Sequence, residues 1–573
     1  MNQATKPGRR TAAPPGARVV IDGAAKQALE IGRNRLFVIA AVFALGFTVI
    51  GGRVVDVMAF KGGTAPKSAA VVVEQPDRAP IRDRNGELLA TSLGTASLFA
   101  DATQVPDAAA AARRLKDVLP ELNEADVRTK LTSERRFVWI HRNLTPRQQY
   151  AVNRLGIPGL SFQREARRVY PQGAMAAHVV GFTDVDGKGI AGIERSFDGA
   201  LAAGTAPIDL SLDMRVQHAV VDELSNAIKS FNAIGGVGVV LDVRSGEVLA
   251  LASLPDFDPN HPGDAKPDNR FNRATLGVYE MGSTFKTFVI AGALDSGTTT
   301  LKGGYDATNP IHVGRFTIED YHAKRRWLSV PEIYIHSSNI GAAKMALDLG
   351  TPQFRAFLRS VGFNEPSPLE IPEVGAPMSP AQWRDVNTMT IAFGHGMAVS
   401  PIQLASATAA MINGGILVQP TLIKRSHAEG TLGTRVISRE TSNDMRRLMR
   451  LVVEQGTAKS AEVPGYLVGG KTGTAEKIGA GGYKKKSLMS SFIGAFPMND
   501  PRYLVLVMLD EPKGNKESYG YATGGWVAAP AGGRIVRRIG PLLGVEPIDD
   551  STPEMKKEMF VVVNPRAPTL ASY

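Results

Sequence analysis

Ser283 and Lys286 form the pair of residues whose types and spacing best fit nucleophilic catalysis in this chain. An apolar segment, 288–294, follows them and predicts a helix that ends near Gly297. Residues three apart on a helix lie on one face, one turn from each other. A serine hydroxyl needs a base within about 2.6–3.2 Å, and a lysine amine is such a base once burial or nearby positive charge lowers its pKa. We therefore expect Ser283 to be a nucleophile and Lys286 its base.

Two further polar motifs follow this pair along the chain. Residues 337–339, Ser-Ser-Asn, fall in a short loop after a predicted helix, and 471–474, Lys-Thr-Gly-Thr, fall on a predicted strand edge. Each motif alone has an ordinary explanation: an exposed polar pair, a helix cap, and a strand with a turn. Their joint occurrence is more specific, because Ser283 is the only serine with a lysine three residues later and 471–473 is the only Lys-Ser/Thr-Gly sequence.

Ser-x-x-Lys, Ser-x-Asn and Lys-Thr-Gly in this order are motifs of penicillin-binding proteins. The chain resembles a class B penicillin-binding protein of the cell-division type, often called penicillin-binding protein 3, which is a monofunctional peptidoglycan DD-transpeptidase. The resemblance extends from the membrane anchor to about residue 545 and is densest over 236–512. It implies an α+β fold, in which a transpeptidase domain with an antiparallel sheet and helices on both faces follows an elongated α/β pedestal domain and one N-terminal transmembrane helix.

The resemblance also implies the roles of the motif residues. Ser283 would attack the carbonyl between the two terminal D-alanines of a peptidoglycan stem peptide, and Lys286, as a neutral amine, would take its proton. Ser337 would relay a proton to the leaving group. Asn339 would hold Lys286 and the substrate backbone. Lys471 would supply positive charge that keeps Lys286 deprotonated and attracts the terminal carboxylate.

The remaining residues of the third motif would bind the substrate. Thr472 and Thr474 would hydrogen-bond the terminal carboxylate, and Gly473 would keep the strand edge flat so that a peptide can approach. The backbone N–H groups of Ser283 and Thr474 resemble the family's oxyanion hole. His395, between two glycines, invites a general-base interpretation, but we favour a packing role.

Composition limits the other possibilities. The chain has 573 residues, a formal net charge of +11 and no cysteine, so it has room for two to four domains and cannot form disulfides. No metal-ligand cluster is visible, and we expect no cofactor. The basic residues are scattered and accompany no nucleic-acid motif, so we expect no nucleic-acid partner.

The N-terminal region predicts a membrane anchor. Residues 1–35 are polar and basic, and we expect a disordered cytoplasmic tail. Residues 36–52 carry no charge, and we expect a transmembrane anchor over 36–55. A cleaved signal peptide is the alternative, but no clear cleavage site follows. The positive tail places the rest of the chain outside the cytoplasm, which here means the periplasmic side of the bacterial inner membrane.

Three segments follow the anchor. We expect a non-catalytic pedestal or dimerisation domain over 56–205, a transpeptidase domain over 206–545 and a loosely attached tail over 546–573. The Asn-Gly pair at 85–86 indicates a hairpin turn, and helical periodicity recurs in the pedestal and the transpeptidase domain. The expected helices are 108–119, 124–131, 146–155, 214–231, one from 401 to about 413, and 442–455; the expected strands are 237–241, 247–251, 467–475, 488–496 and 502–509, with a loop over 479–486.

The sequence thus predicts a septal peptidoglycan transpeptidase that β-lactam antibiotics inhibit by acylating Ser283. The expected partners are the donor and acceptor stem peptides, a membrane-embedded septal glycan polymerase, other division proteins and the inner membrane. An elongation-type transpeptidase, a β-lactamase or carboxypeptidase, and a non-catalytic β-lactam sensor or scaffold are the alternatives.

Overall fold

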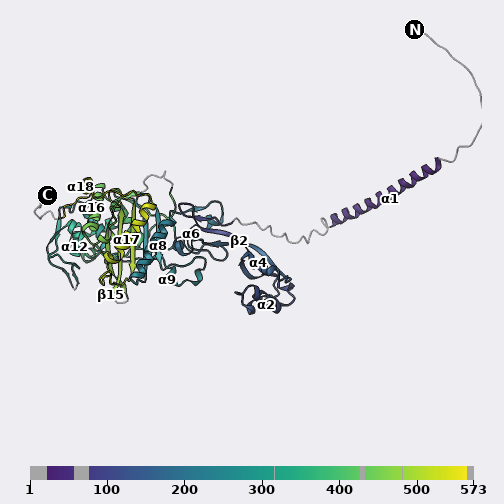
Figure 1. The fold of residues 1–573 in the computed structure, drawn as a ribbon, viewed down its shortest axis with the longest axis horizontal. Helices are drawn as coiled ribbons and strands as arrows, with labels where there is room; N and C mark the ends of the chain where they lie inside the picture. Colours follow the sequence, from purple (N-terminus) through teal and green to yellow (C-terminus); the bar gives the residue numbers. More distant parts are fainter. Residues whose placement is uncertain (1–21, 57–76, 315, 426–432, 480–481, 564–573) are drawn as a thin grey trace, which may run out of the picture. The chain divides into compact units, whose positions relative to one another are not determined.

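The computed structural model describes residues 22–56, 77–314, 316–425, 433–479 and 482–563 (Figure 1). The chain divides into two compact units, Met1–Gln75 and Pro76–Tyr573. The second unit contains the expected pedestal from residue 76 onward and the expected transpeptidase domain.

The first unit contains one long helix, α1 (Asp22–Val55). Its apolar part, Arg35–Val55, has 21 residues and no buried surface. At 1.5 Å per residue this part is about 31 Å long, which is enough to cross a bilayer. The expected disorder over 1–35 is wrong for 22–34, where the backbone is helical. Alanine, leucine, lysine, glutamine and glutamate dominate that stretch, and these residues extend a helix readily. Residues 1–21 of the expected tail lie outside the described residues.

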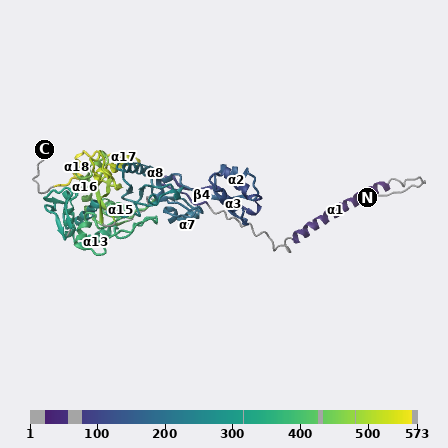
Figure 2. The same cartoon turned by 90° about the horizontal axis from the view of Figure 1, so that it is seen from below.

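The N-terminal part of the second unit is a twisted sheet with helices beside it (Figure 2). Strand β2 is central and pairs antiparallel with β1, β3 and β4, while β5 pairs parallel with β1. The turn between β1 and β2 is held by Asp83 Oδ1, which accepts hydrogen bonds from the N–H groups of Asn85 and Glu87, both at 2.8 Å. The elements are β1 (Ile81–Arg82), β2 (Leu88–Ala100), η3 (Ala102–Gln104), α2 (Ala108–Val118), α3 (Glu124–Leu131), β3 (Val138–Leu144), α4 (Pro146–Asn153), β4 (Leu160–Val169), η4 (Gly173–Ala176), α5 (Ala177–Val180), α6 (Gly192–Ser196), α7 (Asp198–Ala202) and β5 (Ile208–Asp209).

The main sheet is antiparallel, in the order β14-β15-β16-β6-β7. Smaller two-stranded sheets and helices surround it. The remaining elements are α8 (Met214–Ser230), β6 (Gly235–Asp242), β7 (Val248–Leu254), η5 (Pro262–Asp264), α9 (Pro267–Arg270), η6 (Gly282–Phe285), α10 (Lys286–Asp295), β8 (Gly304–Asp306), β9 (Ile311–Val313), β10 (Phe316–Ile318), β11 (Trp327–Ser329), α11 (Val330–Ile335), α12 (Asn339–Leu349), α13 (Thr351–Ser360), α14 (Asp385–Ile391), α15 (Pro401–Ile412), β12 (Ile416–Val418), β13 (Gly433–Arg435), α16 (Arg439–Gln455), η7 (Lys459–Ala461), β14 (Gly469–Gly479), β15 (Gly482–Phe496), β16 (Tyr503–Asp510), α17 (Gly524–Leu542) and α18 (Pro553–Met559).

Helices cover both faces of this sheet, as the sequence predicts. Gly236 and Gly238 of β6 face Leu224 and Val220 of α8, which leaves room for that helix and its neighbour α17. Side chains alternate between the faces of a strand, so Val239 points to the opposite face. Val239 is also fully buried, because α15 packs on that face of the sheet.

Three hydrophobic cores stabilise the second unit, the smallest of them formed by Ile318, Ala343, Met389 and Phe393. The largest core runs through the main sheet and includes Ile81 and Tyr170 from the N-terminal segment. The second core lies entirely within residues 98–152. Because the strands next to the catalytic segment share its core, the pedestal is joined to that segment by packing rather than by a linker.

Two expected element boundaries and the expected loose tail differ from the structure. Strands β14 and β15 extend to Gly479 and Gly482, so a long hairpin replaces the expected loop over 479–486, of which residues 480–481 lie outside the described residues. Helix α16 begins at Arg439 because Ser438 caps it. The expected loose tail packs onto the domain up to residue 563: Ile548 N donates to Gly465 O at 2.8 Å. Residues 564–573 of that tail lie outside the described residues.

Candidate active site

Ser283 lies in a tight turn, η6, directly before helix α10. The turn contacts strand β14 so closely that a Cβ at Gly282 would lie 2.5 Å from Thr474 O, and Gly282 has a φ of +55° that favours glycine. Gly282 N also donates to Gly394 O at 3.3 Å. The serine is therefore positioned by contacts with two distant segments, and it stands in a 3-10 turn rather than in the helix that the sequence predicts.

Lys286 is the first residue of α10 and is fully buried. Its Nζ lies 2.8 Å from Ser283 Oγ, 2.7 Å from Asn339 Oδ1 and 3.2 Å from Ser337 Oγ. Burial, and next the charge of Lys471, lower the pKa of Lys286 well below its usual value. A neutral amine has two N–H donors and one lone pair, so it can donate to Asn339 and Ser337 while it accepts the proton of Ser283.

The Ser337–Asn339 turn connects α11 to α12. Ser338 caps α12 by accepting a hydrogen bond from Gly341 N at 3.0 Å, so the capping explanation applies to Ser338. Ser337 instead adopts a φ of +57°, and its Oγ lies 3.1 Å from Lys471 Nζ as well as near Lys286. Ser337 thus bridges the two lysines, as a proton relay requires.

Lys471 is fully buried on β14, the edge strand of the main sheet within the described residues. Burial lowers the pKa of Lys471 to about 7. The expected positive charge of Lys471 is therefore only partly populated at neutral pH, because desolvation penalises an ammonium group. The lysine Nζ also donates to Thr472 O at 3.2 Å.

The other residues of the third motif differ in their exposure. A Cβ at Gly473 would lie 2.5 Å from Ser491 Oγ and 2.6 Å from Met281 O, so the glycine makes room for Ser491 and for the segment that leads into the nucleophile turn. Thr472 is buried and its Oγ1 pairs with Thr457 Oγ1 at 2.6 Å. Thr474 is partly exposed, and its Oγ1 accepts from Gly524 N at 3.1 Å, which leaves its hydroxyl proton for a ligand.

His395 lies next to this cluster. Burial, together with the nearby Lys286, lowers the pKa of His395 to about 4, which makes its imidazole a weak base at neutral pH. Its ring packs against Phe393, with 5.4 Å between centroids, and Gly396 N donates to Glu280 Oε1 at 2.7 Å. These contacts fit the packing role.

Sequence reasoning missed two residues that contact the Ser337–Asn339 turn. Asp320 Oδ2 accepts a hydrogen bond from Ser338 Oγ at 2.7 Å, and Glu319 O accepts one from Asn339 Nδ2 at 2.9 Å. No spacing rule links them to the turn, because about twenty residues of loop and helix separate the two segments.

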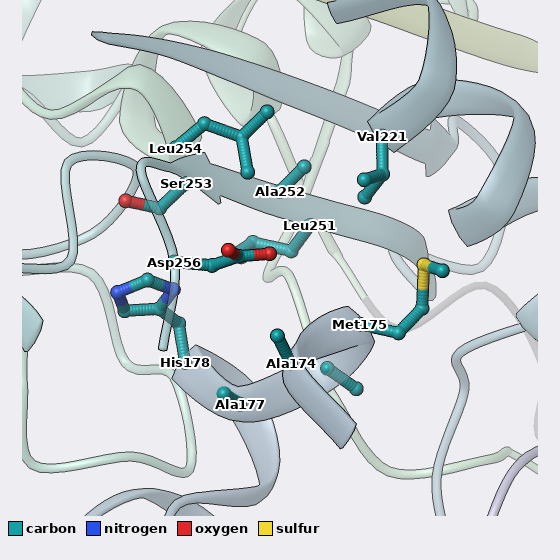
Figure 3. A pocket seen from close by; sticks show the side chains of 11 residues that line it. Ala174, Met175, Ala177, His178, Val221, Leu251, Ala252, Ser253, Leu254 and Asp256 are labelled. Carbon is teal, nitrogen blue, oxygen red and sulfur yellow. The ribbon is translucent and has the colours of Figure 1, made fainter. Parts of the chain in front are cut away.

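A separate pocket lies between β7 and the short helices η4 and α5 (Figure 3). Asp256 and His178 point toward it, and none of the motif residues lines it. Over the part of the chain that the structure describes, no group of three His, Asp or Glu side chains is arranged to hold a metal ion.

Known proteins share this architecture. Residues 236–537 match the penicillin-binding protein transpeptidase domain, and residues 73–207 match the penicillin-binding protein dimerisation domain. The chain is 42% identical to a probable peptidoglycan D,D-transpeptidase FtsI of Caulobacter vibrioides, over 82% of each chain, and 36% identical to the probable transpeptidase PenA of Neisseria gonorrhoeae, over 82% of this chain and 85% of that one. A crystal structure of penicillin-binding protein 3 from Mycobacterium tuberculosis, complexed with aztreonam, has the same fold, with a TM-score of 0.65 at 24% identity over 83% of this chain and 98% of that one.

A family model that covers more than half of the chain, and relatives that match most of it, agree with the motifs and their geometry. The chain belongs to the penicillin-binding protein transpeptidases, as a class B, cell-division-type member of this serine-enzyme family.

Proposed function

We propose that this peptidoglycan D,D-transpeptidase cross-links stem peptides during septal wall synthesis through an acyl-enzyme on Ser283. The observation that carries the proposal is the 2.8 Å contact between Ser283 Oγ and Lys286 Nζ, with the amine fully buried. Burial and Lys471 lower the pKa of Lys286, which favours the neutral form that a general base needs.

Acylation follows from this arrangement. Ser283 Oγ attacks the carbonyl carbon of the penultimate D-alanine, and its proton passes to Lys286 Nζ. The backbone N–H groups of Ser283 and Thr474 stabilise the oxyanion; removing one such donor typically costs about 2.7–4 kcal/mol. The C–N bond then breaks, and the leaving D-alanine amine receives the proton through Ser337 Oγ, which is 3.2 Å from Lys286 and 3.1 Å from Lys471.

Transfer to the acceptor reverses these steps. The amine of a neighbouring stem peptide attacks the ester carbonyl, and a proton moves from that amine to Lys286. The bond to Ser283 Oγ breaks, Ser283 regains a proton from Lys286, and a new peptide bond joins the two stems. The same lysine acts as base in both halves, because it begins each half as a neutral amine.

Substrate binding uses the edge of β14 at the partly exposed Thr474. An extended peptide adds to a strand edge through backbone hydrogen bonds. Thr474 donates its hydroxyl proton to the terminal carboxylate of the donor. Lys471 contributes to this attraction in proportion to its charged fraction. Thr472 acts indirectly in this scheme, because it is buried against Thr457.

β-Lactam antibiotics are the expected inhibitors, since their strained amide presents the same carbonyl to Ser283. The solved penicillin-binding protein 3 in complex with aztreonam supports this expectation. Helix α1 supports an inner-membrane anchor, with the basic N-terminus in the cytoplasm and the catalytic domain in the periplasm. The resemblance to the family implies a membrane-embedded septal glycan polymerase as partner.

Intact-mass spectrometry of the full chain in detergent, with and without penicillin, tests the chemistry. We expect one stable adduct on the wild-type chain and none on Ser283→Ala. An adduct that disappears within seconds would indicate a hydrolase. A folded wild-type chain that forms no adduct would favour the scaffold alternative.

The division role needs a cellular test. The relatives named FtsI support it over the elongation alternative. Depletion of the protein in its host should produce filaments, whereas round cells would contradict the septal assignment.

A further inference from the structure

The Ser337–Asn339 turn holds a conformation that the chain does not adopt by itself. Ser337 has a φ of +57°, a conformation that is unfavourable for a non-glycine residue and persists only when surrounding contacts fix it. Both groups that approach Lys286 from this side, Ser337 Oγ and Asn339 Oδ1, depend on the turn. The contacts that fix it therefore set the geometry of the base.

Glu319 and Asp320 supply those contacts. Asp320 Oδ2 accepts from Ser338 Oγ at 2.7 Å, and Asp320 Oδ1 accepts from Ile340 N at 3.0 Å. Glu319 O accepts from Asn339 Nδ2 at 2.9 Å. Since the amide nitrogen of Asn339 is held by Glu319, its oxygen must face Lys286 Nζ, which lies 2.7 Å away.

A hairpin outside the main sheet positions these two residues. Strands β9 and β10 pair antiparallel, and β10 leads directly into Glu319. Ile318, the last residue of β10, is buried in a small core with Ala343, Met389 and Phe393. Phe393 also lies beneath Lys286, with its ring centroid 5.9 Å from Nζ. The hairpin and the base therefore share a packed neighbour.

We propose that Asp320 is a positioning residue of transpeptidation, which fixes the Ser337–Asn339 turn against Lys286. The inference rests on the proposed function of Ser283 and Lys286. Asp320 acts through Ser338 and Ile340, at the N-terminus of the 11-residue helix α12, where a carboxylate is favourable. It does not touch the reacting atoms.

The charge of Asp320 has a second consequence. Lys286 is faced by Lys471 from β14, by Asp320 after β10, and by His395 from the loop after α14. Lys471 lowers the pKa of Lys286 and Asp320 raises it, although burial dominates, while the pKa of His395, about 4, leaves its imidazole neutral. Removing the negative charge should therefore lower the pKa of Lys286 further and extend its neutral form to lower pH.

The test measures the acylation rate of the full chain in detergent with a fluorescent penicillin, across pH 5–9, for wild type, Asp320→Asn and Asp320→Ala. Asp348→Asn is the matched control, since Asp348 lies on the same helix α12 that Asp320 contacts but bonds Tyr305. The amide oxygen introduced by Asp320→Asn can still accept from Ile340 N. We expect about 10-fold slower acylation for Asp320→Asn at pH 8 and about 100-fold for Asp320→Ala, because small displacements of catalytic groups have effects of this size.

The pH profile separates positioning from a general loss of structure. We expect the acidic limb of the Asp320→Asn profile to move to lower pH and that of Asp348→Asn to stay in place. Variants of Asp320 that match the wild type, or a rate lowered equally at every pH with an unmoved limb, would overturn the role of Asp320. A wild-type chain without a Ser283 adduct would instead contradict the proposed function itself.

Discussion

Replacing Gly473 by alanine is a direct test of how the nucleophile turn is held. A methyl group at this position would lie 2.5 Å from Ser491 Oγ, 2.6 Å from Met281 O and 3.0 Å from Thr284 Cγ2. Non-bonded carbon atoms prefer about 3.5–4.0 Å, so β14 and η6 must separate by about 0.5–1 Å. Overpacking of this kind typically destabilises a protein by about 1–3 kcal/mol.

The displacement falls between the two backbone N–H groups expected to stabilise the oxyanion, those of Ser283 and Thr474. A shift of about 1 Å in a reacting geometry can cost about 100-fold in rate. We therefore expect Gly473→Ala to lower the maximal acylation rate by about 100-fold, with a smaller change in the penicillin concentration that gives half of that rate.

Stopped-flow acylation with a fluorescent penicillin separates the two parameters, and thermal unfolding monitors the fold. Gly199→Ala is the matched control, because a Cβ at Gly199 meets no atom within 4 Å. If Gly473→Ala kept the maximal rate and only weakened binding, Gly473 would serve substrate approach, as its sequence position indicates, and the packing argument would be refuted.

Three further predictions concern the lysines. Lys286→Ala should slow acylation by about 10²–10⁴-fold without unfolding the chain, measured by adduct formation over time. The wild-type acylation rate should fall as pH falls through the pKa of Lys286, because the base must be neutral; a rate that rises toward acid pH would exclude this assignment. Lys471→Met should abolish acylation yet raise the free energy of unfolding at pH 7 by about 1–4 kcal/mol. Because the pKa of Lys471 is lower in the folded chain than in the unfolded chain, burying this amine disfavours folding at every pH below its unfolded pKa. Equilibrium urea unfolding measures this free energy.

The local hydrophobic patterns of the sequence predict many of the helices and strands of this fold. The expected helices at 108–119 and 124–131 correspond to α2 and α3, and the expected strands at 237–241 and 502–509 correspond to β6 and β16. These segments can be predicted from the spacing of their apolar residues, because each one buries either one face or both faces in the core. The motif residues are recognisable in the same way, since serine, lysine and asparagine at short spacings carry their chemistry with them.

The sequence does not show which residues distant along the chain pack against one another. The sequence pattern predicts that Gly473 serves substrate approach, and the structure adds that its missing side chain accommodates Met281 and Ser491. Asp320 is not predicted, because its contacts with the Ser337–Asn339 turn come from a hairpin with a small core of its own.

The order and identity of the motifs were determined by the sequence, and with them the nucleophile and its base as a prediction. The proton affinities were decided by the tertiary structure. Lys286 contacts Asn339, which lies 53 residues away in the sequence, and Lys471 contacts Ser337, which lies 134 residues away. Folding lowers the pKa of both amines by removing water from them, and it lowers that of Lys286 further by placing Lys471 nearby. Neither condition exists along the extended chain.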